Sequence, residues 1–128
     1  MFDWRRPGNL GVTNGRFAAC RRTPNCVSSQ ADPSDREHYI APIAFRGDAI
    51  AAVRKAVDSL PRTRVISADS TYLYAEFRSK LLGYVDDVEF FYDGGAIQVR
   101  SASRLGRRDF GVNRKRVERL RELITQRP

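Results

Sequence analysis

The chain has 128 residues, of which 41% are hydrophobic and 30% charged, and its formal net charge is +8 at pH 7. This length and composition are those of one ordinary globular domain. No apolar stretch approaches the roughly 18 residues of a membrane-spanning helix, so the sequence predicts no membrane span.

The positive charge is concentrated at the two ends of the chain. Residues 100–128 hold ten Lys or Arg against three Asp or Glu, and residues 1–22 hold five Arg against one Asp. Residues 23–99 are net acidic, with eight bases against eleven acids. Such asymmetry favours an anionic partner, either a small anion or an acidic protein surface. The alternative is internal pairing of the bases with acids such as Asp86 and Asp87, and both interpretations stay open.

The first 38 residues show no sustained periodicity. They predict an irregular N-terminal arm (residues 1–38), which precedes an α+β region (residues 39–128) within a single domain. The first residues include no hydrophobic leader segment, and from this the sequence predicts a cytoplasmic location.

The arm contains both cysteines, Cys20 and Cys26. A disulfide that closes so short a loop is worth about 2 kcal/mol, whereas cytosolic surroundings would keep both thiols reduced. A zinc site would need further ligands, and His38, the single histidine, is expected in an exposed loop. The sequence therefore predicts no metal and no cofactor, and leaves the redox state of the cysteine pair open.

The first regular elements follow the arm. Residues 39–45 (YIAPIAF) predict a strand, which Pro42 restricts to the edge of a sheet. Asp48 is a typical helix N-cap, and Pro61 ends the helix that it begins. That helix has one apolar stripe, formed by Ile50, Val53, Val57 and Leu60. The following strands are expected at residues 64–68, at residues 71–79 and in both arms of a hairpin over residues 85–104.

The hairpin is the strongest local signal, because two alternating runs meet at a pair of glycines. A two-residue turn there places Glu89 opposite Arg100 and Phe90 opposite Val99. The predicted core face consists of Val88, Phe90, Tyr92, Ile97, Val99 and Ser101. A last helix is expected to begin near Asn113. Together these elements predict an α+β domain, in which two helices pack on one face of an antiparallel sheet of four to five strands.

Residues 100–116 (RSASRLGRRDFGVNRKR) hold seven bases and one acid, Asp109. Cations in the first turn of a helix cost about 0.3–1 kcal/mol each, and a docked anion would reverse that effect. We therefore expect Arg104 and Arg116 to line a common anion pocket. The candidate ligand-binding residues are Arg78, Arg100, Ser101, Ser103, Arg104, Asn113 and Arg116. The alternative is a structural network, in which the acids Asp86, Asp87 and Asp109 neutralise these bases.

Catalysis is disfavoured, and the sequence offers no set of catalytic residues. Asp86 and Asp87 point to opposite faces of a strand and cannot flank one substrate. The strongest chemical alternative is a thiol-dependent enzyme or redox protein, with Cys26 as the reactive thiol and Cys20 as its resolving partner. A third alternative is an accessory subunit of a larger assembly. Nucleic acid is disfavoured as a partner, because no nucleic-acid-binding signature is present.

Three motifs in order resemble the family catalogued as domain of unknown function 1499. They are CRRTPNCVSS (20–29), FRSKLLGYVDDVEF (77–90) and RSASRLGRRDFGVNRKRVERLR (100–121). The resemblance implies no assigned activity, and it allows a periplasmic or membrane-anchored location with a Cys20–Cys26 bridge. It also implies a shared motif that unites Arg78, Asp86, Asp87, Arg100, Ser101, Ser103, Arg104, Asp109, Asn113 and Arg116.

Overall fold

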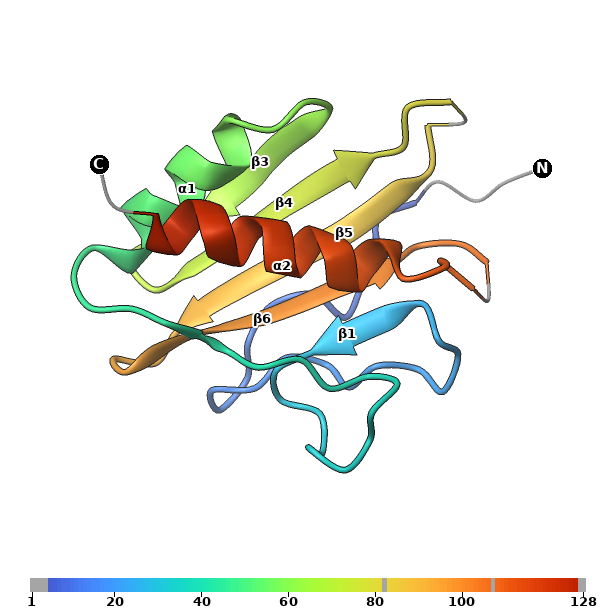
Figure 1. Ribbon diagram of the computed structural model, residues 1–128, viewed down its shortest axis with the longest axis horizontal. Coiled ribbons are helices and arrows are strands. Elements are labelled where there is room, and N and C mark those ends of the chain that lie inside the picture. Colours follow the sequence, from blue (N-terminus) through green and yellow to red (C-terminus); the bar gives the residue numbers. More distant parts are fainter. Residues whose placement is uncertain (1–4, 82, 107, 127–128) are drawn as a thin grey trace.

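Two helices cover one face of a six-stranded antiparallel sheet (Figure 1). The computed structural model describes residues 5–81, 83–106 and 108–126. The strands are β1 (Cys26–Ser28), β2 (Ile43–Ala44), β3 (Thr63–Ala68), β4 (Tyr72–Arg78), β5 (Val85–Tyr92) and β6 (Ala96–Ser103). The helices are α1 (Ala49–Asp58) and α2 (Val112–Thr125). The strand order is β1-β6-β5-β4-β3, and β2 also pairs with β6. The predicted α+β class is confirmed, with one strand more than expected.

The β5–β6 hairpin has the register that the sequence predicts. Glu89 faces Arg100 and Phe90 faces Val99. The Asp93 side chain accepts hydrogen bonds from the backbone N–H groups of Gly95 and Ala96, which fixes the turn. In this register Val88, Phe90 and Val99 face the helices, whereas Glu89 and Arg100 face the other way.

The helices begin where the sequence places short polar or flexible residues. Asp48 caps α1 and accepts a hydrogen bond from the backbone N–H of Ala51 at 3.2 Å. Helix α2 begins at Val112, one residue before the expected position, and its N-cap is Gly111, with φ +81°. A side-chain cap is therefore absent at Gly111 itself, and Asp109 supplies the acceptor instead.

The hydrophobic core lies between the helices and the sheet. Most of its fully buried members come from α1, α2 and the three long central strands, and Ile43 of β2 joins them. They include Val53, Val57, Leu73, Val88, Phe90, Ile97, Val99, Val117 and Leu120. The stripe predicted for α1 and the core face predicted for the hairpin both contribute to it.

The predicted arm contributes a strand and covers the second face of the sheet. Strand β1 pairs with β6, so that Val27 lies beside Ser101. The segment before β1 passes behind the sheet (Figure 1), and the backbone N–H of Gly11 donates to Glu89 at 2.8 Å. The sheet therefore carries helices on one face and the arm on the other.

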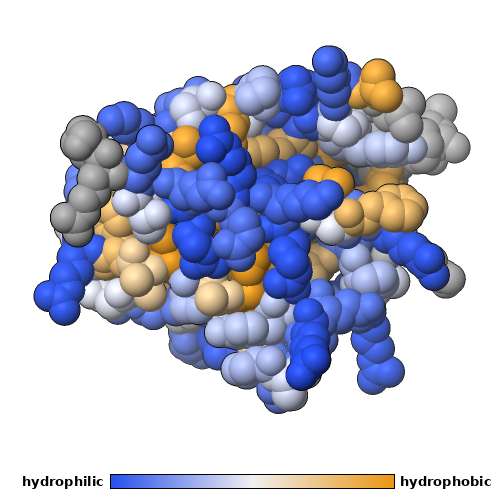
Figure 2. All heavy atoms as spheres, in the orientation of Figure 1, coloured by the Kyte–Doolittle hydropathy of each residue, from blue (hydrophilic) through white to orange (hydrophobic). Residues whose placement is uncertain are grey.

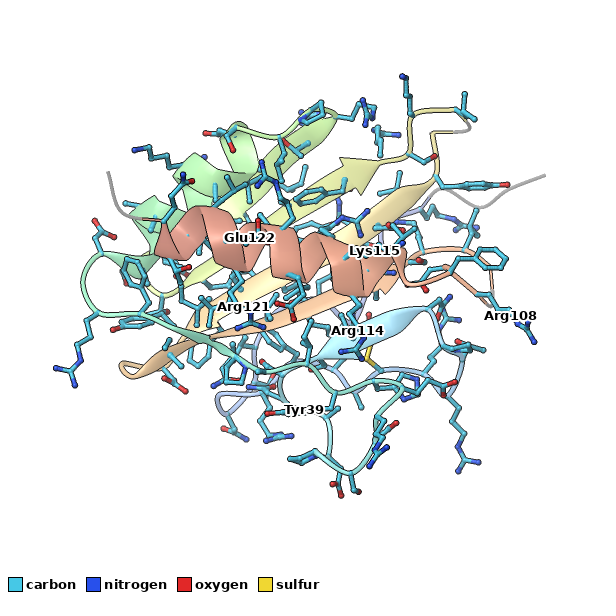
Figure 3. All side chains as sticks on the ribbon, in the orientation of Figure 1. Tyr39, Arg108, Arg114, Lys115, Arg121 and Glu122 are labelled. Atoms are coloured by element: carbon cyan, nitrogen blue, oxygen red, sulfur yellow. A yellow bond between two sulfur atoms is a disulfide. The ribbon has the colours of Figure 1, made fainter. Side chains whose placement is uncertain are left out.

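Part of the positive charge of the C-terminal region holds the chain segment before β2. Arg114 donates to the backbone carbonyl of Tyr39 at 2.9 Å, and Arg121 donates to that of Pro42 at 2.7 Å (Figure 3). Both arginines lie on α2. These bases are used inside the fold, and their partners here are backbone carbonyls, not the acids of the predicted internal pairing.

Candidate functional site

Asp86 and Asp87 belong to two separate polar clusters, because neighbouring strand residues point to opposite faces of a sheet. We call the cluster beneath α2 the helix-face network, formed by Asp86, Ser101, Ser103, Asn113 and Arg116. The cluster beneath the arm is the arm-face network, formed by Arg6, Tyr72, Tyr74, Glu76, Asp87, Glu89, Arg100 and Arg104.

The helix-face network is closed on itself. The Arg116 guanidinium lies 2.7 Å from an Asp86 carboxylate oxygen and stacks on the Phe77 ring, 4.9 Å from its centroid. Arg116 also donates to Asn113 Oδ1 at 2.9 Å, and Ser101 Oγ donates to the same oxygen at 2.6 Å. Because each charged group here already has a close partner, this face offers little to a ligand.

The N-terminus of α2 is occupied by the protein's own carboxylate. Asp109 accepts hydrogen bonds from the backbone N–H groups of Gly111 and Asn113, and from the Asn113 side chain. Burial raises the pKa of Asp109, but these hydrogen bonds outweigh it and hold the pKa below its ordinary value. The anion that the sequence predicts at this helix start is therefore supplied internally.

In the arm-face network, Arg104 is the best-paired cation. Its guanidinium lies 2.6 Å from Asp87 and 2.9 Å from Glu76, and its side chain is 6% exposed. Arg6 from the arm also reaches Glu76, at 2.9 Å. Burial raises the pKa of Glu76, but hydrogen bonds from Arg104 and Arg6 outweigh it and hold the pKa below its ordinary value.

Tyrosine hydroxyls complete the arm-face network. Tyr74 donates to Asp87, and Tyr72 donates to Glu89 at 2.7 Å. Burial, together with these hydrogen bonds to carboxylates, raises the pKa of both phenols. Both tyrosines therefore stay protonated and serve as donors to the buried acids.

Arg100 is a buried cation that the described residues pair only weakly. It is 7% exposed, its nearest contact with Glu89 is 4.0 Å long, and it donates a long hydrogen bond of 3.4 Å to the carbonyl of Ala19. Its Nε atom and the Oε1 atom of Glu89 are buried without a hydrogen-bond partner in the described chain. Burial lowers the pKa of Arg100, and the positive charge of Arg21 adds to this effect.

A cavity of about 330 Å³ lies between the arm and this part of the sheet. Its lining comes from the start of the arm, the cysteine loop, β5 and the end of β6. The residues are Pro7, Asn9, Arg21, Asn25, Cys26, Asp87, Arg100, Ala102, Ser103 and Arg104. The lining thus contains three guanidinium groups and one carboxylate, which gives the cavity a positive balance.

The structure divides the predicted ligand-binding residues. Three of them, Arg100, Ser103 and Arg104, line the cavity. Ser101, Asn113 and Arg116 belong to the helix-face network, and Arg78 is exposed at the end of β4. The expected common pocket of Arg104 and Arg116 is wrong, because their carboxylate partners, Asp87 and Asp86, lie on opposite faces of the sheet.

Among the lining residues that the sequence did not predict are Arg21 and Asn25. Both lie in the loop closed by the Cys20–Cys26 disulfide, whose S–S distance is 2.08 Å. The pairing of Cys26 with Ala102 in the β1–β6 ladder brings this loop to the cavity. The motif CRRTPNC contains both residues, but a three-residue strand gives no signal in the sequence that would place it beside β6.

His38 is buried, at 7% exposure, and the prediction of an exposed loop is wrong. Its Nδ1 lies 2.8 Å from a carboxylate oxygen of Asp35 and its Nε2 lies 3.0 Å from the carbonyl of Thr23. Burial lowers the pKa of His38, but the bonds to Thr23 and Asp35 outweigh it and raise the pKa above its ordinary value. Since both partners are acceptors, the protonated ring fits this site, and it fastens the cysteine loop.

The fold and these clusters define a small α+β protein with a sheet between a helical layer and an irregular arm. The model of the family described as "Protein of unknown function (DUF1499)" matches residues 16–124. The chain therefore belongs to this family, as its motifs predict. No curated protein matches the chain.

Proposed function

We propose that this protein is a non-enzymatic binding module, which takes a small oxyanion into the cavity between the arm and β6. The single observation that carries the proposal is Arg100. Its guanidinium is buried, lies 4.0 Å from the nearest carboxylate oxygen and lines a cavity of about 330 Å³, and its Nε has no hydrogen-bond partner among the described residues.

The contrast with Arg104 supports this choice of site. Arg104 is held at hydrogen-bond distance by Asp87 and Glu76, so its charge is already compensated. Burying a charge without such partners is costly, and an anion beside Arg100 would remove that cost. The planar fork of an arginine fits the two oxygens of a carboxylate or phosphate group.

A further lining residue suits an anion. Arg21 is exposed and adds a second positive charge next to Arg100. The side chains of Asn25 and Ser103, which also line the cavity, are engaged by Gly106 and Asn113. The ligand class is thus a small molecule that carries one carboxylate or phosphate group, since an arginine binds the oxygens of either group in the same way.

Thermal unfolding tests the proposal. The melting temperature is measured in phosphate, citrate or sulfate and compared with chloride at matched ionic strength. A ligand at about 100 times its Kd stabilises the folded state by about 2.7 kcal/mol. Arg21→Ala is expected to reduce the rise in melting temperature, and Arg22→Ala, which changes an exposed neighbour outside the cavity lining, is the matched control. Equal responses in Arg21→Ala and the unmodified protein would place the anion elsewhere.

The thiol-dependent alternative is not part of this proposal. Both cysteines form the Cys20–Cys26 disulfide, so neither is free to act as a nucleophile in this state. Titration of thiols under native and denaturing conditions, without reductant, tests this point. A reactive thiol in the native protein would favour the alternative.

A further inference from the structure

Three large hydrophobic side chains stand out as exposed among the described residues. They are Leu81 at 91%, Phe110 at 86% and Val112 at 46%. Leu81 lies in the turn between β4 and β5. Phe110 lies in the connection between β6 and α2, and Val112 is the first residue of α2. Both connections lie at the same end of the sheet (Figure 1), because Asp86 at the start of β5 pairs with the end of β6.

The two connections form one continuous surface. A groove of about 400 Å³ is lined from both sides, by Ser79 and Tyr84 from the β4–β5 turn and by Leu105, Phe110 and Val112 from the β6–α2 connection. In the space-filling view, hydrophobic side chains protrude at this end of the molecule (Figure 2). Exposed apolar groups gathered at one place mark an interaction surface.

The backbone holds Phe110 in an unusual conformation. Its φ is +53°, which is uncommon for a bulky side chain, and the following Gly111 has φ +81°. Asp109, the preceding residue, is fixed by its hydrogen bonds to the start of α2. The loop therefore presents Phe110 to solvent in a local conformation that is unfavourable for an isolated residue, and such positions are often functional.

Exposed cations lie close in sequence to these apolar side chains. Lys80 precedes Leu81, Arg108 lies two residues before Phe110, Arg78 ends β4, and Lys115 lies in the first turn of α2. Arg108 extends away from the molecule at this end, and Lys115 lies on the nearby helix (Figure 3).

The acids at this end do not cancel these charges, because they are engaged inside the fold. Asp86 pairs with Arg116 at 2.7 Å, and Asp109 accepts hydrogen bonds from the start of α2.

We infer that this end of the molecule docks on the surface of an anionic phospholipid bilayer. We call it the apolar end, formed by Leu81, Phe110 and Val112 with Arg78, Lys80, Arg108 and Lys115. Leu81 and Phe110 enter the headgroup region, and the cations lie against lipid phosphates. Apolar groups combined with a basic rim are the pattern by which proteins bind such surfaces without crossing them. No helix in the described part of the chain is long and apolar enough to span a bilayer.

Vesicle co-sedimentation tests the inference. The full chain is mixed with vesicles of phosphatidylcholine alone or with added phosphatidylglycerol, at about 0.1 M salt and at about 0.5 M salt. We expect binding to the anionic vesicles, weaker binding at high salt, and little binding to phosphatidylcholine alone. The double variant Leu81→Ser/Phe110→Ser is expected to lose about tenfold or more in affinity. Its melting temperature should not fall, since both side chains are exposed.

Two double charge-reversal variants distinguish docking through the apolar end from general electrostatic attraction to the vesicle. Lys80→Glu/Arg108→Glu is compared with Arg46→Glu/Arg54→Glu, which makes the same change in net charge at exposed residues of the β2–α1 region. The inference requires that the first double variant lose much more vesicle binding than the second. Equal losses, or full vesicle binding by Leu81→Ser/Phe110→Ser, would overturn it.

The docking surface is independent of the proposed anion cavity, and one variant distinguishes them. Arg21 lines the cavity, whereas it does not line the groove of the apolar end. Arg21→Ala should retain vesicle binding while its response to phosphate falls. Loss of vesicle binding in Arg21→Ala would instead assign the headgroup to the cavity and overturn docking through the apolar end.

Discussion

The two polar networks both pair arginines with buried acids, on opposite faces of one sheet, but they differ in how completely their charges are paired. On the helix face, Arg116 meets Asp86 at 2.7 Å, and Asn113 receives hydrogen bonds from both Arg116 and Ser101. On the arm face, Arg104 is equally well paired, whereas the distance from Arg100 to Glu89 is 4.0 Å. In the proposed function, this incomplete pairing is what distinguishes Arg100 from the structural arginines Arg104 and Arg116.

Arg104→Met should give the largest effect on stability. The substitution leaves Asp87 and Glu76 as buried acids, and removal of one partner from such a pair costs about 3–5 kcal/mol. Urea unfolding monitored by circular dichroism measures the change. Arg78→Met, at the exposed last position of β4, is the control, and its free energy of unfolding should stay within about 0.5 kcal/mol of that of the unmodified protein. A loss below about 1 kcal/mol for Arg104→Met would mean that the arm-face network does not support the fold.

Arg116→Gln should cost less, about 2 kcal/mol at neutral pH, because its partner can take up a proton. Burial raises the pKa of Asp86, against the effect of Arg116. A carboxyl with a raised folded-state pKa binds more protons in the folded state, so its unfavourable contribution shrinks as the pH falls. The cost of Arg116→Gln should therefore be smaller at about pH 4.5 than at pH 7. Unfolding curves at both pH values measure this difference, and a cost independent of pH would contradict the assignment to Asp86.

Arg100→Met should cost less stability than Arg104→Met, because the contact that it removes, between Arg100 and Glu89, is 4.0 Å long, whereas Arg104 is held by two carboxylates at hydrogen-bond distance. The same variant should lose the rise in melting temperature that phosphate produces. This combination separates a ligand-accepting arginine from a structural one. A large loss of stability together with an unchanged response to phosphate would put Arg100 in the same category as Arg104.

The sequence predicts the local parts of this fold well, because they rest on short-range rules. The glycine pair and the alternation of apolar residues fix the register of Glu89 with Arg100, and Asp48 marks the start of α1. Strand β1 has only three residues, and its pairing with β6 depends on contacts between segments more than 70 residues apart. No local pattern encodes such a pairing.

The candidate site illustrates the same limit. Arg104 and Arg116 are near in sequence and share a basic run, which led to the expectation of one pocket. Their positions are decided by Asp86 and Asp87, whose opposite directions follow from strand geometry. That rule was available from the sequence and would have predicted two clusters. No such rule places Arg21 at the cavity, because its position depends on where the cysteine loop meets β6.

The smallest expected effect concerns the pH dependence of the cysteine loop, which carries Arg21 to the cavity. His38 has a pKa raised above its ordinary value of 6.5, because its bonds to Thr23 and Asp35 outweigh its burial. Its contribution to stability is therefore complete below pH 6.5 and is lost as the pH rises through the folded-state pKa. His38→Gln should lower the melting temperature at pH 6 and flatten its decline above neutral pH, as measured by thermal unfolding across that range. Glu37→Gln is the matched control, because that carboxylate lies 3.9 Å from the ring and should alter the profile little. An unchanged profile in His38→Gln would mean that the charged imidazole does not fasten the loop, and the arm-face cavity would then depend on the disulfide and β1 for its shape.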